Sequence, residues 1–235
     1  MRHSLFGFTL IELAMVLFIV SLLLGGLLVP LATQVEGRNR QLAQRKLDDI
    51  KEALIGFAII NGRLPCPTTQ TDPADAAYGS EDAACNVTVT TEGFLPWKTL
   101  GVSAYDQWGV TRVSSADPWN GYWRYRVDRN FSLPFNLGTG TIDNLTVQDS
   151  QNNTLTSTTE RPIAIVYSTG ANQTQDGQNS SYEQNPSGNA TGTVPNGYPL
   201  YQGGEANNVT VFDDITIWLT RPLLFNRMVV SGKLP

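Results

Sequence analysis

Residues 7–20 read Gly7-Phe8-Thr9-Leu10-Ile11-Glu12 and then LAMVLFIV, and this stretch decides the expected fold. It opens an apolar run from Phe8 to Ala32 in which Glu12 is the single charged residue. Because about 20 apolar residues of helix cross a bilayer, the run predicts a membrane-spanning helix. The basic residue Arg2 before it predicts a cytoplasmic amino terminus, with the rest of the chain outside the cytoplasm.

Glu12 is the residue in this run that needs an explanation. An ionised side chain near the bilayer centre costs roughly 2.5 to 3.5 kcal/mol, so it calls for a partner. A secretory signal peptide would have a shorter apolar stretch without a carboxylate. A plain membrane anchor accounts for the length of the run but leaves Glu12 unpaired. Both remain as alternatives.

The motif Gly7-Phe8-Thr9-Leu10-Ile11-Glu12 resembles the cleavage site and first mature residues of type IV pilins and of the pseudopilins of type II secretion systems. The resemblance implies that a prepilin peptidase cuts between Gly7 and Phe8 and methylates the new amino terminus. Glu12 lies one helical turn after Phe8, so its carboxylate can pair with the new ammonium of its own chain. The resemblance favours a pair with the Phe8 ammonium of a neighbouring subunit in a filament instead. The expected partners are other pilin or pseudopilin subunits, the prepilin peptidase, and an inner-membrane assembly platform.

Four segments follow from this interpretation. They are a leader (residues 1–7), a membrane-spanning and filament-core helix (8–32), an amphipathic helix (33–62), and a β-rich head (63–235). Leu47, Ile50, Leu54 and Phe57 form one stripe at helical spacing, and Gly62 with Pro65 predicts the end of the helix. We therefore expect an α+β fold in which one long amino-terminal helix packs on an antiparallel sheet.

Strand signals occur throughout the head. Asn120-Gly121 predicts a hairpin turn leading into a strand at residues 122–127, and further strands are expected at 162–167, 209–212 and 215–219. The polar stretch 171–204 is long for a connection in a compact domain, which indicates either disorder or a functional surface loop. The many aromatic residues between Gly93 and Val127 are expected to form a core, with a binding platform for sugar or peptide as the alternative.

Cys66 and Cys85 are the only cysteines, and in a chain expected to reach an oxidising compartment they predict one disulfide. The segment Asp117-Pro118-Trp119-Asn120-Gly121 is similar to the Asp-Pro-Trp-Gly segment of major pseudopilins. That resemblance implies calcium in a carboxy-terminal loop, for which Asp213 and Asp214 are weak candidates with only one oxygen-rich pair. Neither a metal ion nor any other cofactor is predicted from these residues.

Catalysis is not expected from this composition. The single histidine, His3, lies in the leader, so neither a Ser-His-Asp arrangement nor a histidine-based zinc site can form in the processed chain. An enzyme would need a carboxylate pair, such as Asp213 with Asp106 or Asp117. The net charge of −5 argues against nucleic-acid binding.

The function expected from the resemblance is a structural filament subunit, a minor pilin or a pseudopilin. It would be held in the inner membrane as a single-pass protein with a periplasmic head, and would then enter a filament or reach the cell surface. The alternative is an adhesin or substrate-binding module at a filament tip, using the aromatic residues or loop 171–204.

Overall fold

The computed structural model describes residues 9–83, 85, 92–182, 200–204 and 212–234, without the side chains of 24–32 and 180–182. The chain divides into two compact units, Met1–Asn39 and Arg40–Pro235. In chain order the elements are α1 (Leu10–Asn61), β1 (Gly93–Phe94), α2 (Trp97–Leu100), β2 (Arg124–Val127), η1 (Arg129–Phe131), β3 (Thr146–Gln148), β4 (Pro162–Ser168), η2 (Gly177–Tyr182), β5 (Leu200–Gln202), β6 (Ile215–Thr220) and α3 (Arg221–Val230).

The prediction of a membrane-spanning first half of the helix is wrong. Within the part of the chain that the structure describes, no helix is both long enough and apolar enough to cross a membrane. The charged residue Glu12 lies near the start of α1, among the apolar residues on which the prediction rested. The predicted location, a single-pass inner-membrane protein with a periplasmic head, depended on that span. That prediction is therefore also wrong.

The α+β class and the antiparallel sheet are as expected. Four strands lie in the order β1-β2-β4-β6, and every neighbouring pair is antiparallel. Tyr125 of β2 pairs with Val166 of β4, and Ile165 of β4 pairs with Trp218 of β6. A separate pair of short parallel strands, β3 and β5, brings Val147 opposite Tyr201.

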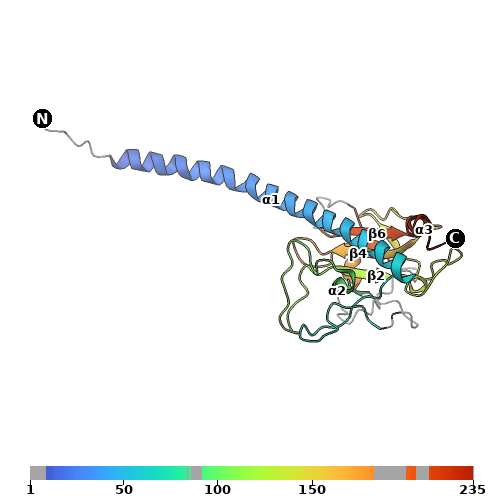
Figure 1. Cartoon of the computed structure of the whole chain (residues 1–235). Helices are drawn as coiled ribbons and strands as arrows, with labels where there is room; N and C mark the ends of the chain where they lie inside the picture. The colour runs from blue at the N-terminus through green and yellow to red at the C-terminus, as the bar shows by residue number, and fades with distance from the viewer. Residues whose placement is uncertain (1–8, 84, 86–91, 183–199, 205–211, 235) are drawn as a thin grey trace. The chain divides into compact units, whose positions relative to one another are not determined.

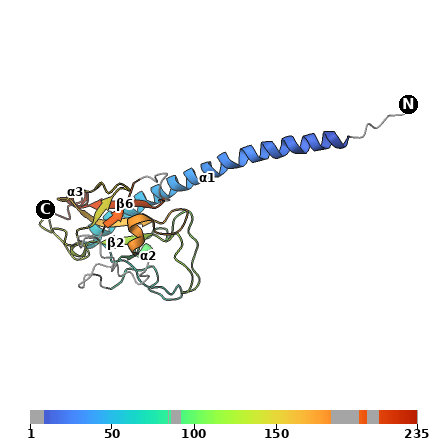
Figure 2. The ribbon, with the colours of Figure 1, turned by 180° about the vertical axis from the view of Figure 1, so that it is seen from behind.

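The part of α1 after Arg40 lies along one face of the four-stranded sheet (Figures 1 and 2). The buried stripe comprises Ala43, Leu47, Ile50, Leu54 and Ala58, each at most 1% exposed. The predicted stripe was right for three of its four members. Phe57 lies at the edge instead, half-buried beneath the guanidinium of Arg63, because Ala58 continues the spacing of four from Leu54 and occupies the inner position.

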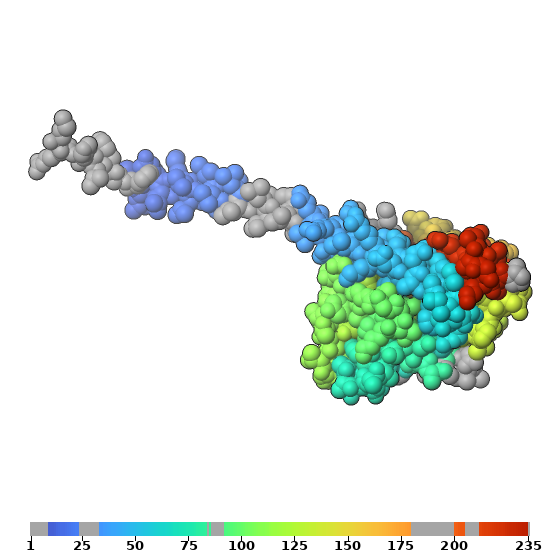
Figure 3. All heavy atoms as spheres, viewed as in Figure 1, coloured from blue at the N-terminus to red at the C-terminus, as the bar shows by residue number. Residues whose placement is uncertain are grey.

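Helix α1 ends where the sequence predicts. Gly62 adopts a left-handed conformation at φ 71°, and its N–H donates to the carbonyl of Ala58 at 2.8 Å. Near this end lies α3, in red beside cyan α1 in Figure 3. Leu224 and Met228 of α3 enter the same core as Leu54, so the carboxy-terminal segment closes the helical side of the head.

The predicted hairpin is only partly correct. A turn does form, since the Tyr122 N–H donates to the Trp119 carbonyl at 3.1 Å and Gly121 has φ 71°. However, β2 pairs with β1 and β4 rather than with a strand directly before Asn120. The strand expected at 209–212 falls mostly outside the described residues, as does the middle of loop 171–204.

Candidate functional site

The amino-terminal motif is described only from Thr9 onward. Gly7 and Phe8, the predicted cleavage site, lie outside the described residues. Glu12 has a partner in its own helix. The Thr9 backbone N–H and hydroxyl donate to Glu12 Oε2 at 3.0 and 2.9 Å, and the Glu12 N–H donates to the Thr9 hydroxyl at 3.3 Å. This is a reciprocal capping box at the start of α1.

The capping box changes the interpretation of Glu12. Hydrogen bonds from the Thr9 backbone and then from its side chain hold the pKa of Glu12 below its ordinary value, which favours the ionised carboxylate. The pattern Thr-x-x-Glu is readable in the sequence, but the partner expected for Glu12 was the Phe8 ammonium of the same or a neighbouring chain, not Thr9. Thr9 is therefore a site residue that sequence reasoning missed.

Beyond the capping box, the first turns of α1 expose apolar side chains around the whole helix. Leu10 is 89% exposed, and exposure continues at the large apolar positions as far as Leu23. A helix that is apolar on every side is normally buried in a larger assembly. Among the residues that the structure describes, nothing packs against this apolar surface.

The disulfide between Cys66 and Cys85 is confirmed, with Cα atoms 5.5 Å apart. The loop is also tied by Glu81, whose carboxylate receives two hydrogen bonds from Arg63 at 2.8 and 2.9 Å and one from the Cys66 N–H at 3.1 Å. Burial raises the pKa of Glu81, but these hydrogen bonds outweigh it, so the net shift is downward.

The two weak calcium candidates gain a third carboxylate. One oxygen from each of Asp176, Asp213 and Asp214 lies within 4.8 Å of the others. Asp214 Oδ2 accepts from the Asp176 N–H at 3.1 Å and from Asn179 Nδ2 at 2.8 Å. Burial raises the pKa of Asp214 to about 8, against those hydrogen bonds, which lower it. We call these three residues the aspartate cluster.

The aspartate cluster retains unused ligand atoms. The Oδ1 atoms of Asp213 and Asp214 are buried and accept no hydrogen bond within the described structure, and Asp214 is only 1% exposed. Buried carboxylate oxygens without a donor are costly unless something compensates them, and Ca²⁺ prefers such oxygens. The donor set therefore fits a hard divalent cation. Asp176 could not have been assigned from sequence, since it reaches Asp213 across 37 residues.

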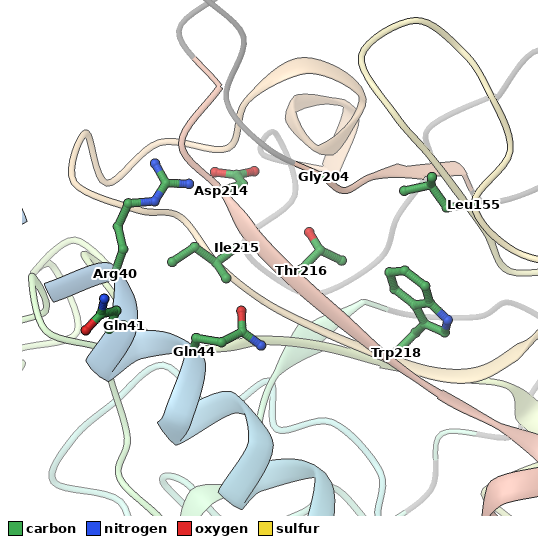
Figure 4. Close-up of a pocket in the computed structure, with 9 residues that line it drawn as sticks. All are labelled: Arg40, Gln41, Gln44, Leu155, Gly204, Asp214, Ile215, Thr216 and Trp218. Atoms are coloured by element: carbon green, nitrogen blue, oxygen red, sulfur yellow. The ribbon is translucent and has the colours of Figure 1, made fainter. Parts of the chain in front are cut away.

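Asp214 also lines a groove of about 460 Å³ between α1 and β6 (Figure 4). Arg40 extends from α1 toward the Asp214 carboxylate, while Trp218 and Leu155 lie at the opposite end of the groove. The cluster thus has a positively charged neighbour on its open side. Such a neighbour partly offsets the charge of three carboxylates and limits how strongly a cation is held.

Asp106 and Asp117, the two carboxylates considered as catalytic partners of Asp213, make their hydrogen bonds elsewhere. Asp106 accepts hydrogen bonds from the Ser168 hydroxyl and from the backbone of Trp108 and Gly109. Asp117 accepts from the backbone N–H groups of Val113 and Ser114. These contacts organise loops, and the carboxylates gathered around Asp213 are Asp176 and Asp214 instead.

The aromatic residues between Gly93 and Val127 contribute to the core, as predicted. Tyr122, Trp123 and Tyr125 are at most 2% exposed. Trp119 is half-buried, and groups stack against its ring. Phe94 lies 3.7 Å away between ring centroids, and the Arg112 guanidinium lies 3.8 Å from its ring centroid. The faces of Trp119 are therefore occupied by protein groups, which argues against an open aromatic platform.

A buried polar network centres on Glu92, which is 1% exposed. Arg124 Nη2 lies 2.6 Å from Glu92 Oε1, and the hydroxyls of Tyr167 and Tyr201 donate to the same carboxylate at 2.9 and 2.8 Å. Gln175 donates to both the Tyr167 hydroxyl and Glu92. The network joins β2, β4, β5 and the loop after β4 through one carboxylate.

No protein-family model, curated protein or solved structure matches this chain. Function is therefore inferred from its residues and their geometry.

Proposed function

We propose that this chain is a structural subunit of a filament, a minor pilin or pseudopilin, and that it assembles through the amino-terminal part of α1. The supporting observation is the exposed apolar surface from Leu10 to Leu23. Burying one large apolar side chain contributes about 1.5 to 3 kcal/mol, so packing these helices side by side supplies a strong driving force. The equivalent helices of other subunits provide a matching apolar surface.

The motif supplies the processing step of the proposal. A prepilin peptidase cuts after Gly7, and Phe8 becomes the methylated amino terminus. Thr9 remains in the mature chain, so the capping box with Glu12 survives processing. The box keeps Glu12 ionised at the start of the helix, where its charge can meet the Phe8 ammonium of a neighbouring subunit. The other partners are further pilin or pseudopilin subunits and an assembly platform.

Three variants separate capping from charge. Glu12→Gln retains an amide oxygen that can complete the capping box but removes the charge. Thr9→Val removes the capping hydroxyl and leaves the charge. Glu12→Ala removes both. We expect cleavage after Gly7 in all three, filament incorporation in Thr9→Val, and loss of incorporation in both Glu12 variants. The measurement is the amount of each variant in sheared filaments, with the total cellular amount as reference.

The outcomes distinguish the possible roles of Glu12. If Glu12→Gln assembles normally and Thr9→Val does not, helix capping is what matters and the charge-pairing role is wrong. If all three variants assemble normally, the amino-terminal helix does not direct assembly through Glu12, and this part of the proposal fails.

A second function is favoured by the orphaned oxygens of the aspartate cluster, namely binding of a divalent cation that stabilises the head. Asp213→Asn and Asp214→Asn test it. Asp48→Asn is the matched control because Asp48 is exposed on α1 and belongs neither to the cluster nor to the lining of the groove. Calcium chloride should raise the melting temperature of the wild type and of the control, and should have no effect on the cluster variants. An equal rise in all four proteins would contradict cation binding at this site.

A further inference from the structure

A small cavity of about 220 Å³ lies beside the aromatic stack. Three separate stretches of the chain build it. Phe94 comes from β1, Trp119, Asn120 and Arg124 come from β2 and the turn before it, and Thr169, Gln173 and Gln175 come from the segment after β4. The aromatic segment and the start of loop 171–204 therefore meet at one site, which we call the amide pocket.

The amide pocket is lined by groups whose hydrogen-bonding capacity is not used. The Thr169 hydroxyl is buried, in a residue 6% exposed, and has no hydrogen-bond partner in the structure as described. Gln175 donates through Nε2 to Tyr167 and Glu92, and its carbonyl oxygen receives no donor from the described residues. A buried polar group without a partner costs free energy that a ligand can recover.

Two further amide side chains of the pocket also have hydrogen-bonding atoms that are not used. Gln173 donates through Nε2 to the Trp108 carbonyl at 2.7 Å, which leaves its carbonyl oxygen without a donor among the residues described. Asn120 makes no side-chain hydrogen bond within the same part of the chain. Gln173 also has φ 61°, a left-handed conformation that is uncommon for a residue other than glycine. The strained backbone holds this amide at the pocket, and such strain is concentrated at functional positions.

The charge of the pocket limits the class of ligand. Of the described residues that line the pocket, only Arg124 has a charged side chain. Its Nη2 lies 2.6 Å from Glu92 Oε1, so the guanidinium is neutralised. An anion would have to compete with a buried carboxylate already in place, and a cation would face a guanidinium. A neutral ligand with hydroxyl groups suits the site, because each hydroxyl both donates and accepts, as the amides and Thr169 require.

The size of the pocket limits the ligand further. Pockets for drug-sized ligands occupy about 300 to 1,000 Å³, so this one suits a single small ring. Phe94, Pro118 and the edge of Trp119 add apolar surface for the C–H groups of such a ring. We infer that the amide pocket binds one neutral polyhydroxylated ring, a pyranose unit of a glycan. This inference goes beyond the proposed filament role and does not depend on it.

The test uses the full chain, kept in solution with a zwitterionic detergent that carries no sugar. The probes are the methyl pyranosides of glucose, galactose and mannose, together with N-acetylglucosamine. Binding is measured by saturation-transfer NMR on the ligand, followed by titration. Sodium acetate and sodium sulfate serve as anionic probes, and tetramethylammonium chloride as a cationic one.

Two substitutions address the pocket directly, each with a matched control. Thr169→Val removes the orphaned hydroxyl at nearly constant shape, and Thr158→Val makes the same change at an exposed position. Asn120→Ala removes the unpaired amide, and Asn226→Ala does so on the exposed face of α3. We expect at least one pyranoside to bind, each pocket variant to weaken it about 3- to 10-fold, and both controls to leave its affinity unchanged.

Three results would overturn the inference. The first is the absence of binding by every pyranoside to the folded wild type. The second is pyranoside binding that the pocket variants leave unchanged, which would place it elsewhere. The third is displacement of the pyranoside by acetate or sulfate, which would make the site an anion site. Thermal denaturation of each variant confirms that it is folded before binding is compared.

Discussion

Replacing Glu92 by glutamine is predicted to destabilise the head strongly. Glu92 Oε1 faces Arg124 at 2.6 Å and accepts from the Tyr167 hydroxyl at 2.9 Å, while Oε2 accepts from the Tyr201 hydroxyl at 2.8 Å. The substitution puts an amide N–H₂ against one of these donors and leaves the buried guanidinium without a counter-charge. Breaking a buried pair in this way costs about 3 to 5 kcal/mol.

The magnitude can be checked by urea and thermal denaturation of the full chain. For a chain of this size each kcal/mol corresponds to about 2 to 4 °C, so the melting temperature should fall by roughly 10 °C. Glu52→Gln is the matched control, because the Glu52–Arg227 pair is at 3.1 Å but 61% and 48% exposed. An exposed pair contributes about 0 to 1 kcal/mol, so this variant should differ little from the wild type.

A double variant separates the charge from the rest of the network. Glu92→Leu combined with Arg124→Met removes both charges and should recover part of the lost stability, although the two tyrosine hydroxyls then lack their acceptor. The reasoning is refuted if Glu92→Gln loses less than about 1 kcal/mol, or no more than Glu52→Gln.

Three further predictions concern stability. Replacing Cys66 and Cys85 together by serine should cost about 3 kcal/mol in urea denaturation, and a reductant should abolish the difference from the wild type. Because the pKa of Glu81 is lowered in the folded state, its pairing with Arg63 stabilises above the ordinary carboxyl pKa and is lost as the pH falls. The stability gap between wild type and Glu81→Gln should therefore shrink on acidification below about pH 4.5, and a constant gap would contradict this. Gly101→Ala and Gly121→Ala both place alanine in a left-handed conformation, but only at Gly121 would the new Cβ lie 2.3 Å from the Gly109 Cα. Gly101→Ala should cost about 1 to 2 kcal/mol and Gly121→Ala clearly more, as measured by thermal denaturation.

The local features of this fold could be predicted from sequence. The spacing of Leu47, Ile50 and Leu54 identifies the buried face of α1, because a helix places them on one side. The same reasoning misplaced Phe57, since an aromatic residue at the edge of a stripe can be covered by a neighbouring side chain such as Arg63. The capping box of Thr9 and Glu12 is also local, and its motif was visible.

The site residues that depend on tertiary structure could not be predicted in the same way. Asp176 joins Asp213 and Asp214 only because the segment after β4 folds back against the start of β6. Glu92 finds Tyr201 across 109 residues. The membrane span was wrong for a different reason: apolar composition alone was taken to define a spanning helix, whereas no helix among the described residues is both long and apolar enough to cross a membrane.

The central claim is that the chain is a processed filament subunit, and the most direct test is mass spectrometry of its amino-terminal peptide. The protein is isolated from cells with and without the prepilin peptidase. The account predicts a methylated Phe8 start that appears only when the peptidase is present. An intact Met1 start in both kinds of cell would contradict it.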